Sequence, residues 1–179
     1  MRRTRVALLL AAAAATFATA CSPPGPTSSP QPSLPPPPTA AVGVDGQPIE
    51  NLCELLSSQD FTSVTGGTAT APDASKATAT SATCEYGKNM RLAVNVSASA
   101  DEAELAFDQA SKKLSAPEAG TMAGVDESAS GTTSGNLGLV VRRRLLVFTI
   151  EIPASVDQGK FKLIQLGGML LERAHALGT

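Results

Sequence analysis

The chain has 179 residues, of which 42% are hydrophobic and 17% are charged, and its formal net charge at pH 7 is −2. This balance provides no basic footprint for nucleic acid. Only five Phe, one Tyr and no Trp are present, so a core has to be built from Leu, Val, Ile and Ala.

Residues 1–20 have the three parts of a bacterial export signal. Three arginines stand among the first five residues, an uninterrupted apolar run covers 6–15, and Ala18-Thr19-Ala20 provides small residues for cleavage. The run has about half the length that a bilayer-spanning helix needs. We therefore expect a signal peptide and no retained membrane helix.

Cys21 follows this signal directly. The sequence Ala-Thr-Ala-Cys resembles the lipobox of bacterial lipoproteins, in which the cysteine is acylated and becomes the first residue of the mature chain. Acyl chains contribute ~0.8 kcal/mol per buried CH₂, so we expect Cys21 to hold the chain on the extracytoplasmic face of the cell membrane. The alternative is ordinary secretion, which would leave Cys21 as an exposed thiol.

Residues 21–47 contain most of the chain's 13 prolines, including the run Pro35 to Pro38. Such a segment favours polyproline II and cannot bury a core, so we expect a disordered linker. At ~3.1 Å per residue, its 23 residues from Ser22 to Val44 would reach at most about 70 Å. A spacer that holds a domain clear of the membrane is the simplest interpretation, and a ligand for a proline-recognising module is the alternative.

Residues 48–179 suffice for one domain. With Cys21 assigned to lipid, Cys53 and Cys84 are the two remaining cysteines, and an exported compartment permits their oxidation. We expect a disulfide that closes a loop of about 30 residues and contributes about 3.5 kcal/mol. The alternative, a metal site, lacks further ligands.

Apolar spacing predicts the first elements of this domain. Apolar residues recur every three or four positions over 49–58, which predicts a helix with Cys53 facing inward. The Gly-, Thr-, Ala- and Ser-rich segment 62–80 is typical of a loop. A short strand is predicted over 84–86, and the alternation over 91–97 predicts a strand with one buried face.

A second helix is predicted over 101–114, with Ser99 and Glu102 as its capping box. Alternation over 137–152 predicts a hairpin.

A last helix is predicted over 158–177, with Asp157 as its cap. In this helix, Gly167-Gly168 indicates either close packing against the sheet or a kink that opens a pocket. The element order predicts an α+β fold, a curved antiparallel sheet with helices packed on one face.

Three segments together resemble a family. NLCELLSSQDF (51–61) resembles a Cys-x-Leu-Leu…Asp opening, CEYG (84–87) is similar to a second cysteine followed by an aromatic residue, and GVDESA (124–129) is similar to a Gly-x-Gly-Asp-x-Ala turn. The family is that of actinobacterial lipoproteins with the domain of unknown function numbered three-five-five-eight. The resemblance implies an envelope lipoprotein and brings no catalytic residues.

Few residues offer catalytic chemistry. His175 lies near the end of the predicted last helix, where a cation interacts favourably with the helix dipole, and no Ser stands in a Gly-x-Ser-x-Gly setting. Asp126 and Glu127 are adjacent in a predicted loop. Paired carboxylates can hydrolyse glycosides, although a solvated turn is the simpler interpretation.

Arg142, Arg143 and Arg144 form the densest charge cluster, at the expected hairpin turn. A solvated turn explains them, and the alternative is contact with an acidic envelope protein, a phospholipid headgroup or an anionic wall polymer.

We expect a tethered, non-enzymatic binding or accessory domain without a cofactor and without a nucleic-acid partner. Its contact surface would be the sheet or a cleft between sheet and helices, and its partner another envelope protein or a small apolar ligand. The alternatives are a carrier of lipid, which needs a cavity of several hundred Å³, and a hydrolase that uses carboxylates.

Overall fold

The structure is a computed structural model that describes residues 51–75 and 77–175. The predicted signal peptide (1–20) and the whole predicted linker (21–47), with the predicted lipidation site Cys21, lie outside the described residues. Within the described part of the chain, no helix is both long and apolar enough to cross a membrane.

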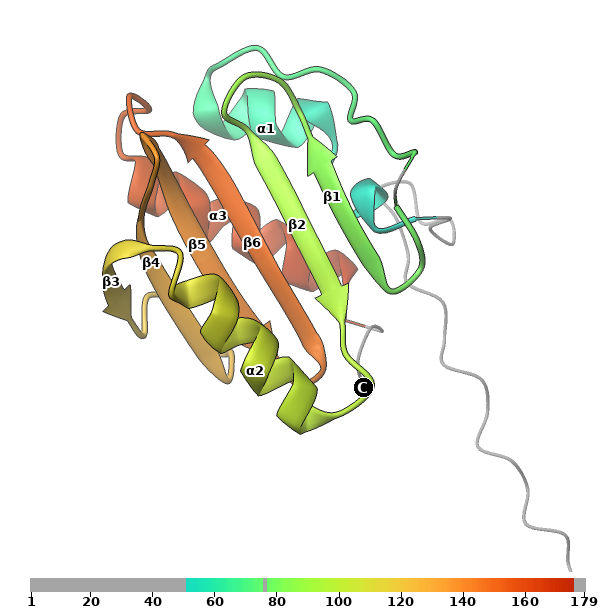
Figure 1. Cartoon of the computed structure of the whole chain (residues 1–179). Coiled ribbons are helices and arrows are strands. Elements are labelled where there is room, and N and C mark those ends of the chain that lie inside the picture. The colour runs from blue at the N-terminus through green and yellow to red at the C-terminus, as the bar shows by residue number, and fades with distance from the viewer. Residues whose placement is uncertain (1–50, 76, 176–179) are drawn as a thin grey trace, which may run out of the picture. The chain divides into compact units, whose positions relative to one another are not determined.

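Six strands form one antiparallel sheet in the order β1-β2-β6-β5-β4-β3 (Figure 1). The strands are β1 Ser81–Glu85, β2 Arg91–Val96, β3 Ser115–Ala119, β4 Glu127–Thr133, β5 Asn136–Arg143 and β6 Leu146–Pro153. Strands β5 and β6 are the hairpin predicted over 137–152, and β2 pairs with β6. The predicted antiparallel sheet is confirmed.

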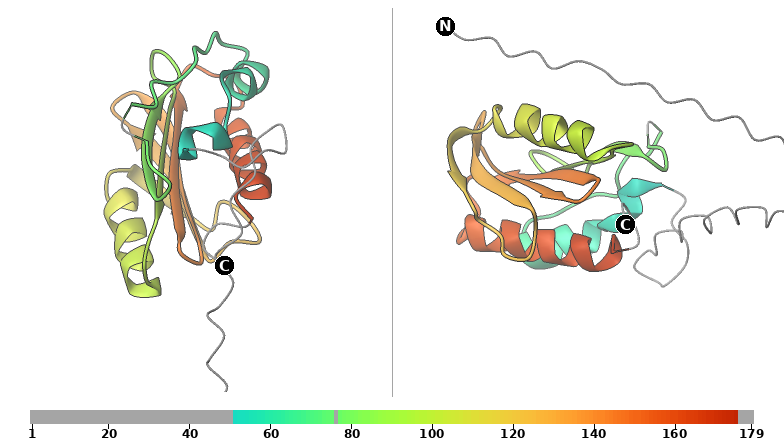
Figure 2. Two further views of the ribbon diagram at one scale, coloured as in Figure 1. Left: turned by 90° about the vertical axis from the view of Figure 1, so that its right-hand side faces the viewer. Right: turned by 90° about the horizontal axis from the view of Figure 1, so that it is seen from below.

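The helices divide between the two faces of this sheet. One face is covered by η1 (Leu52–Leu55), α1 (Ser58–Thr65) and α3 (Gly159–Arg173), and the other carries α2 (Ala100–Ser111) (Figure 2, left). The α+β class is confirmed, while the expectation that helices pack on one face needs a correction for α2. The reason lies in β5 and β6, where Val140 and Val147 stand between apolar neighbours. Strands that are apolar at successive positions bury both faces.

The two faces bury cores of unequal size. The main core, against α1 and α3, takes alternate residues of the central strands, such as Leu92, Phe148 and Ile150. The small core beneath α2 consists of Ala103, Phe107, Leu114, Ala129, Val140 and Val147. Because full burial of a Leu, Ile or Phe side chain stabilises the fold by ~1.5–3 kcal/mol, the main core provides most of the hydrophobic stabilisation.

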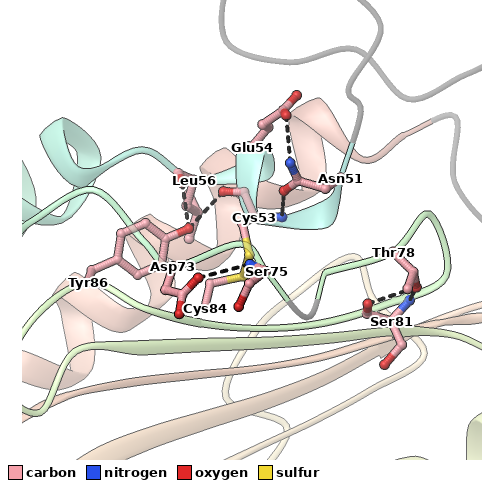
Figure 3. Close-up of a disulfide and its surroundings, with 10 residues drawn as sticks. All are labelled: Asn51, Cys53, Glu54, Leu56, Asp73, Ser75, Thr78, Ser81, Cys84 and Tyr86. Atoms are coloured by element: carbon pink, nitrogen blue, oxygen red, sulfur yellow. Dashed lines mark hydrogen bonds between the residues drawn. A yellow bond between two sulfur atoms is a disulfide. The ribbon is translucent and has the colours of Figure 1, made fainter.

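The disulfide predicted between Cys53 and Cys84 is present and links η1 to β1 (Figure 3). Tyr86, fully buried, adds a polar contact at the same place: its hydroxyl lies 2.8 Å from the carbonyl oxygen of Cys53 and 2.6 Å from that of Leu56. Burial raises the pKa of Tyr86 above its usual range, so this hydroxyl remains a neutral donor. The start of the domain is thus held to the sheet by a covalent bond and by a hydrogen-bonding tyrosine.

Helix α1 begins at a capping box that splits the helix predicted over 49–58. The Ser57 hydroxyl accepts from the backbone N–H of Asp60 at 3.1 Å, and the Asp60 carboxylate accepts from the backbone N–H of Ser57 at 2.6 Å. Residues before the box form η1, and α1 continues to Thr65, inside the segment predicted to be a loop. The loop prediction over 62–80 is therefore wrong for its first residues.

The predicted caps of α2 and α3 have different outcomes. At α2 the Ser99 hydroxyl accepts from the backbone N–H of Glu102 at 3.3 Å, as expected, while the Glu102 carboxylate accepts from Ala98. At α3 the predicted cap Asp157 is wrong. The N-cap is Gln158, in the left-handed region at φ 52°, and it makes no side-chain capping bond. The helix then starts at Gly159, where a Cβ would lie 2.3 Å from Leu137 Cδ1 of β5, so glycine lets the start of α3 lie close to the sheet.

Candidate functional site

A groove lies between α2 and the β3–β4 edge of the sheet, on the face that carries the small core. We call it the α2 groove. Its volume is about 650 Å³, within the ~300–1,000 Å³ of small-molecule sites. Its walls come from the C-terminal half of α2, from β3 and β4, and from the loop between these strands (Figure 1). The lining residues are Phe107, Ser111, Lys112, Leu114, Pro117, Ala119, Gly120, Met122, Val125, Asp126, Glu127, Ser128 and Ala129.

The groove is hollow because the sheet beneath it carries small side chains. Ala119 of β3 and Ala129 of β4 are cross-strand partners and both line the groove. On the next strand inward, Ala129 pairs with the larger Val140, which is fully buried in the small core. The packing beneath α2 therefore thins out towards the β3 edge and leaves space there.

Leu114 anchors the connection between α2 and β3 on this thin part of the sheet. A Cβ placed on Gly131 would lie 3.0 Å from the Leu114 Cβ and 2.8 Å from the Ser115 carbonyl oxygen, and a Cβ on Gly138 would lie 2.8 Å from Leu114 Cδ2. Gly131 and Gly138 are cross-strand partners. This glycine pair lets the chain approach the sheet closely enough for Leu114 to be buried at 6% exposure.

Two carboxylates line the groove, and both are occupied by arginines. The Arg142 Nε donates to the Glu127 carboxylate at 2.5 Å, and Arg142 Nη1 lies 3.7 Å from Asp126. The backbone N–H of Arg144 also donates to Asp126. The hydrogen bond to Glu127, together with the nearby carboxylate charges, raises the pKa of Arg142 in spite of partial desolvation, so the guanidinium stays charged.

The structure thus divides the predicted arginine cluster. The side chain of Arg142 is 18% exposed and lies in the ion pair with Glu127. Arg143 and Arg144 are exposed at the β5–β6 turn, and a contact between them and an acidic partner stays a prediction. The structure also brings Asp126 and Glu127 next to Arg142, a proximity that the sequence analysis did not anticipate. Their pairing supports a structural role for both carboxylates.

A second polar cluster joins α1 to α3 and was not predicted from the sequence. Asp60 of α1 receives two bonds from Arg173 at the end of α3, Nη1–Oδ2 at 2.7 Å and Nη2–Oδ1 at 3.0 Å, and Arg173 Nη1 also donates to the Leu55 carbonyl oxygen at 2.9 Å. Burial alone would raise the pKa of Asp60, but the bonds from Arg173 and Ser57 outweigh it and hold the pKa below its usual value. The Ser57-x-x-Asp60 spacing was the available signal for the local half of this cluster.

Other candidate chemistry is sparse in the described ranges. His175 lies just beyond the end of α3, exposed, with Nδ1 3.0 Å from the Glu172 carbonyl oxygen. Among residues 51–75 and 77–175, no three His, Cys, Asp or Glu side chains gather closely enough to hold a metal ion. The α2 groove, a cavity with mixed apolar and charged lining, is therefore the candidate functional site.

Comparison with known proteins adds no identification. No protein-family model matches this chain, and no curated protein matches it. The family resemblance carried by residues 51–61 and 84–87 stays a prediction.

Proposed function

We propose that this chain is an envelope lipoprotein, tethered to the extracytoplasmic face of the cell membrane through Cys21. The support is the export signal over 1–20, the cysteine directly after it, and the proline-rich segment 21–47 that would serve as a spacer. The resemblance of its opening segment to actinobacterial lipoproteins supports the same proposal.

The proposed role of the tethered domain is non-catalytic binding, with the α2 groove as the contact surface. The observation that carries this role is the groove itself: about 650 Å³, lined by apolar side chains together with Lys112, Asp126 and Glu127. A few polar groups around an apolar hollow are the usual composition of a ligand site. The pairing of Asp126 and Glu127 with Arg142 supports binding over carboxylate-based hydrolysis, because both carboxylates are already occupied.

Photo-crosslinking in cells tests this role. A photoreactive amino acid replaces Ser111, which lines the groove, in the full-length chain, and a second strain carries it at Ala154, exposed and outside the groove. We expect a discrete adduct from position 111 that is absent from position 154. Adding Ala119→Trp, which fills the groove from an exposed edge strand, should remove that adduct.

The design separates binding from misfolding. An unchanged circular dichroism spectrum of the Ala119→Trp chain shows that the fold survives. The same adducts from both positions, or an adduct that survives Ala119→Trp, would mean that the groove is not the contact surface.

A further inference from the structure

We infer that the α2 groove holds a single-chain amphiphile, with an apolar chain along the groove and an anionic head against Lys112. This inference rests on the proposed binding role of the groove and adds the chemical class of its ligand. Three features of the groove carry it: its apolar wall, its two occupied carboxylates and its one unpaired cation.

The apolar wall suits a flexible chain. Phe107 and Leu114 contribute from the small core. Met122 and Val125 contribute from the β3–β4 loop and are half-buried, because they also pack against the main core. Met is unbranched and adapts its shape to irregular apolar surfaces. The floor of Ala119 and Ala129 offers no side chain that would block a chain lying along it.

The carboxylates do not recruit a cationic head. Glu127 accepts from Arg142 at 2.5 Å, and Asp126 accepts from the backbone N–H of Arg144. A cationic ligand would have to compete with these bonds, and the partly buried Arg142 would lose its partner. A buried charge that loses its partner is costly, so the structure disfavours a cation at this border.

Lys112 is the charged group of the groove that remains available. It lies at the C-cap of α2, is exposed, and makes no ion pair or side-chain hydrogen bond with any described residue. Two charged neighbours have to be considered. Asp108 precedes Lys112 by one helical turn without pairing with it, and the adjacent Lys113 lines a separate, smaller pocket beside Arg91. An ammonium beside an apolar groove is complementary to a carboxylate or phosphate head.

Matched fluorescent probes test the inference. The full-length acylated chain is placed in nanodiscs of phosphatidylcholine, and empty nanodiscs provide the background. One probe is dansyl-labelled undecanoic acid, and the other has the same labelled chain ending in a quaternary ammonium. We expect the anionic probe to bind more tightly than the cationic probe. Lys112→Met keeps the length of the apolar stem and should weaken binding of the anionic probe about fivefold, which is the effect of one exposed charge pair.

The control variants separate binding in the groove from recognition of the anionic head. Lys88→Met removes an exposed lysine at the β1–β2 turn and should leave both affinities unchanged. If Ala119→Trp abolishes binding of both probes but Lys112→Met leaves binding of the anionic probe unchanged, the groove is the binding site but the ligand is not selected for an anionic head. Binding of the cationic probe that is equal to or tighter than that of the anionic probe would also contradict an anionic head. Binding of both probes that is indifferent to Ala119→Trp would overturn the groove itself.

Discussion

The carboxylate of Asp60 is an ionised group at a position that is 7% exposed. It accepts two bonds from Arg173 and two from Ser57, one of them from the backbone and one from the hydroxyl. A buried ion pair contributes little net stability when compared with apolar replacements, but removal of one partner leaves the other charge without compensation. The pair joins α1 to α3, so its loss affects the packing of both helices.

Replacing Asp60 with Asn should lower the free energy of unfolding by about 3 kcal/mol at neutral pH, because Arg173 would keep its charge without a carboxylate. Urea denaturation of the full chain measures this change. Asp157→Asn is the matched control: Asp157 is exposed and does not cap α3, so its effect should stay within about 0.5 kcal/mol. A similar loss of unfolding free energy in the two variants would contradict a stabilising role of the Asp60–Arg173 pair.

The same variants make the pH dependence testable. Since the folded-state pKa of Asp60 is lowered, its contribution is fully present above the unfolded value of about 3.9 and is lost as the pH falls through the folded value. The free energy of unfolding should therefore fall more steeply below about pH 4 in the unmodified chain than in Asp60→Asn. Parallel curves in acid would contradict this origin.

The Cys53–Cys84 and Asp60–Arg173 pairs show which contacts between residues a sequence can predict. The Cys53–Cys84 disulfide could be predicted by elimination, because only two cysteines remained for an oxidising compartment. Asp60 and Arg173 are 113 positions apart, and no local sequence motif indicates that they pair. Pairing of that kind follows from the placement of helices, which local spacing does not encode.

At the scale of elements, the paired glycines of α3 have unlike surroundings. A Cβ on Gly167 would lie 3.2 Å from Leu139 Cδ2 and 3.3 Å from the Met122 sulfur, whereas a Cβ on Gly168 meets nothing within 4 Å. The first glycine lets α3 lie close to β5 and to the β3–β4 loop. The expectation of close packing is therefore confirmed for Gly167 and does not apply to Gly168.

Alanine at each position separates the two effects. Gly168→Ala should raise the free energy of unfolding by about 0.5–1 kcal/mol, because Ala is the better helix former and the space is open. Gly167→Ala gains the same propensity but displaces Leu139 and Met122, so it should be less stable than Gly168→Ala. Thermal and urea unfolding give both values. Equal stabilisation by the two substitutions would rule out the packing role.

Strands β3 and β4 explain why the α2 groove could not be predicted. The sequence of β4, ESASGTT, contains no large apolar residue, so hydrophobic alternation is absent. Its serines are buried nevertheless, because Ser128 Oγ accepts from the backbone N–H of Met122 at 2.9 Å and Ser130 Oγ lies 3.0 Å from Thr121 Oγ1. Small polar residues that bond to a loop form this edge of the sheet. Hydrophobic alternation does not predict such a strand, because it depends on apolar residues.

At the scale of the whole molecule, the sheet separates two tasks. The face towards α1 and α3 carries the main core, the disulfide and the Asp60–Arg173 pair. The other face carries α2 and the small core (Figure 2). The groove lies beside α2 at the β3–β4 edge, where Met122 and Val125 of its lining also pack against the main core. The central strands β5 and β6, which are buried on both faces at Val140 and Val147, form the layer between the two cores. The disulfide and the Asp60–Arg173 pair are thus distinct from the residues proposed to bind.

This separation predicts how loss of the disulfide will act. Replacing both Cys53 and Cys84 with Ala should lower the free energy of unfolding by about 3.5 kcal/mol, because the unfolded chain regains the entropy of the opened loop. The groove is formed by α2, β3, β4 and their connecting loop, none of which contains either cysteine. While the double variant remains folded, its affinity for the dansyl-labelled undecanoic acid should therefore stay within about twofold, because the binding residues keep their packing. A fall in affinity that parallels the fall in stability would instead show that the two faces are energetically coupled through the sheet.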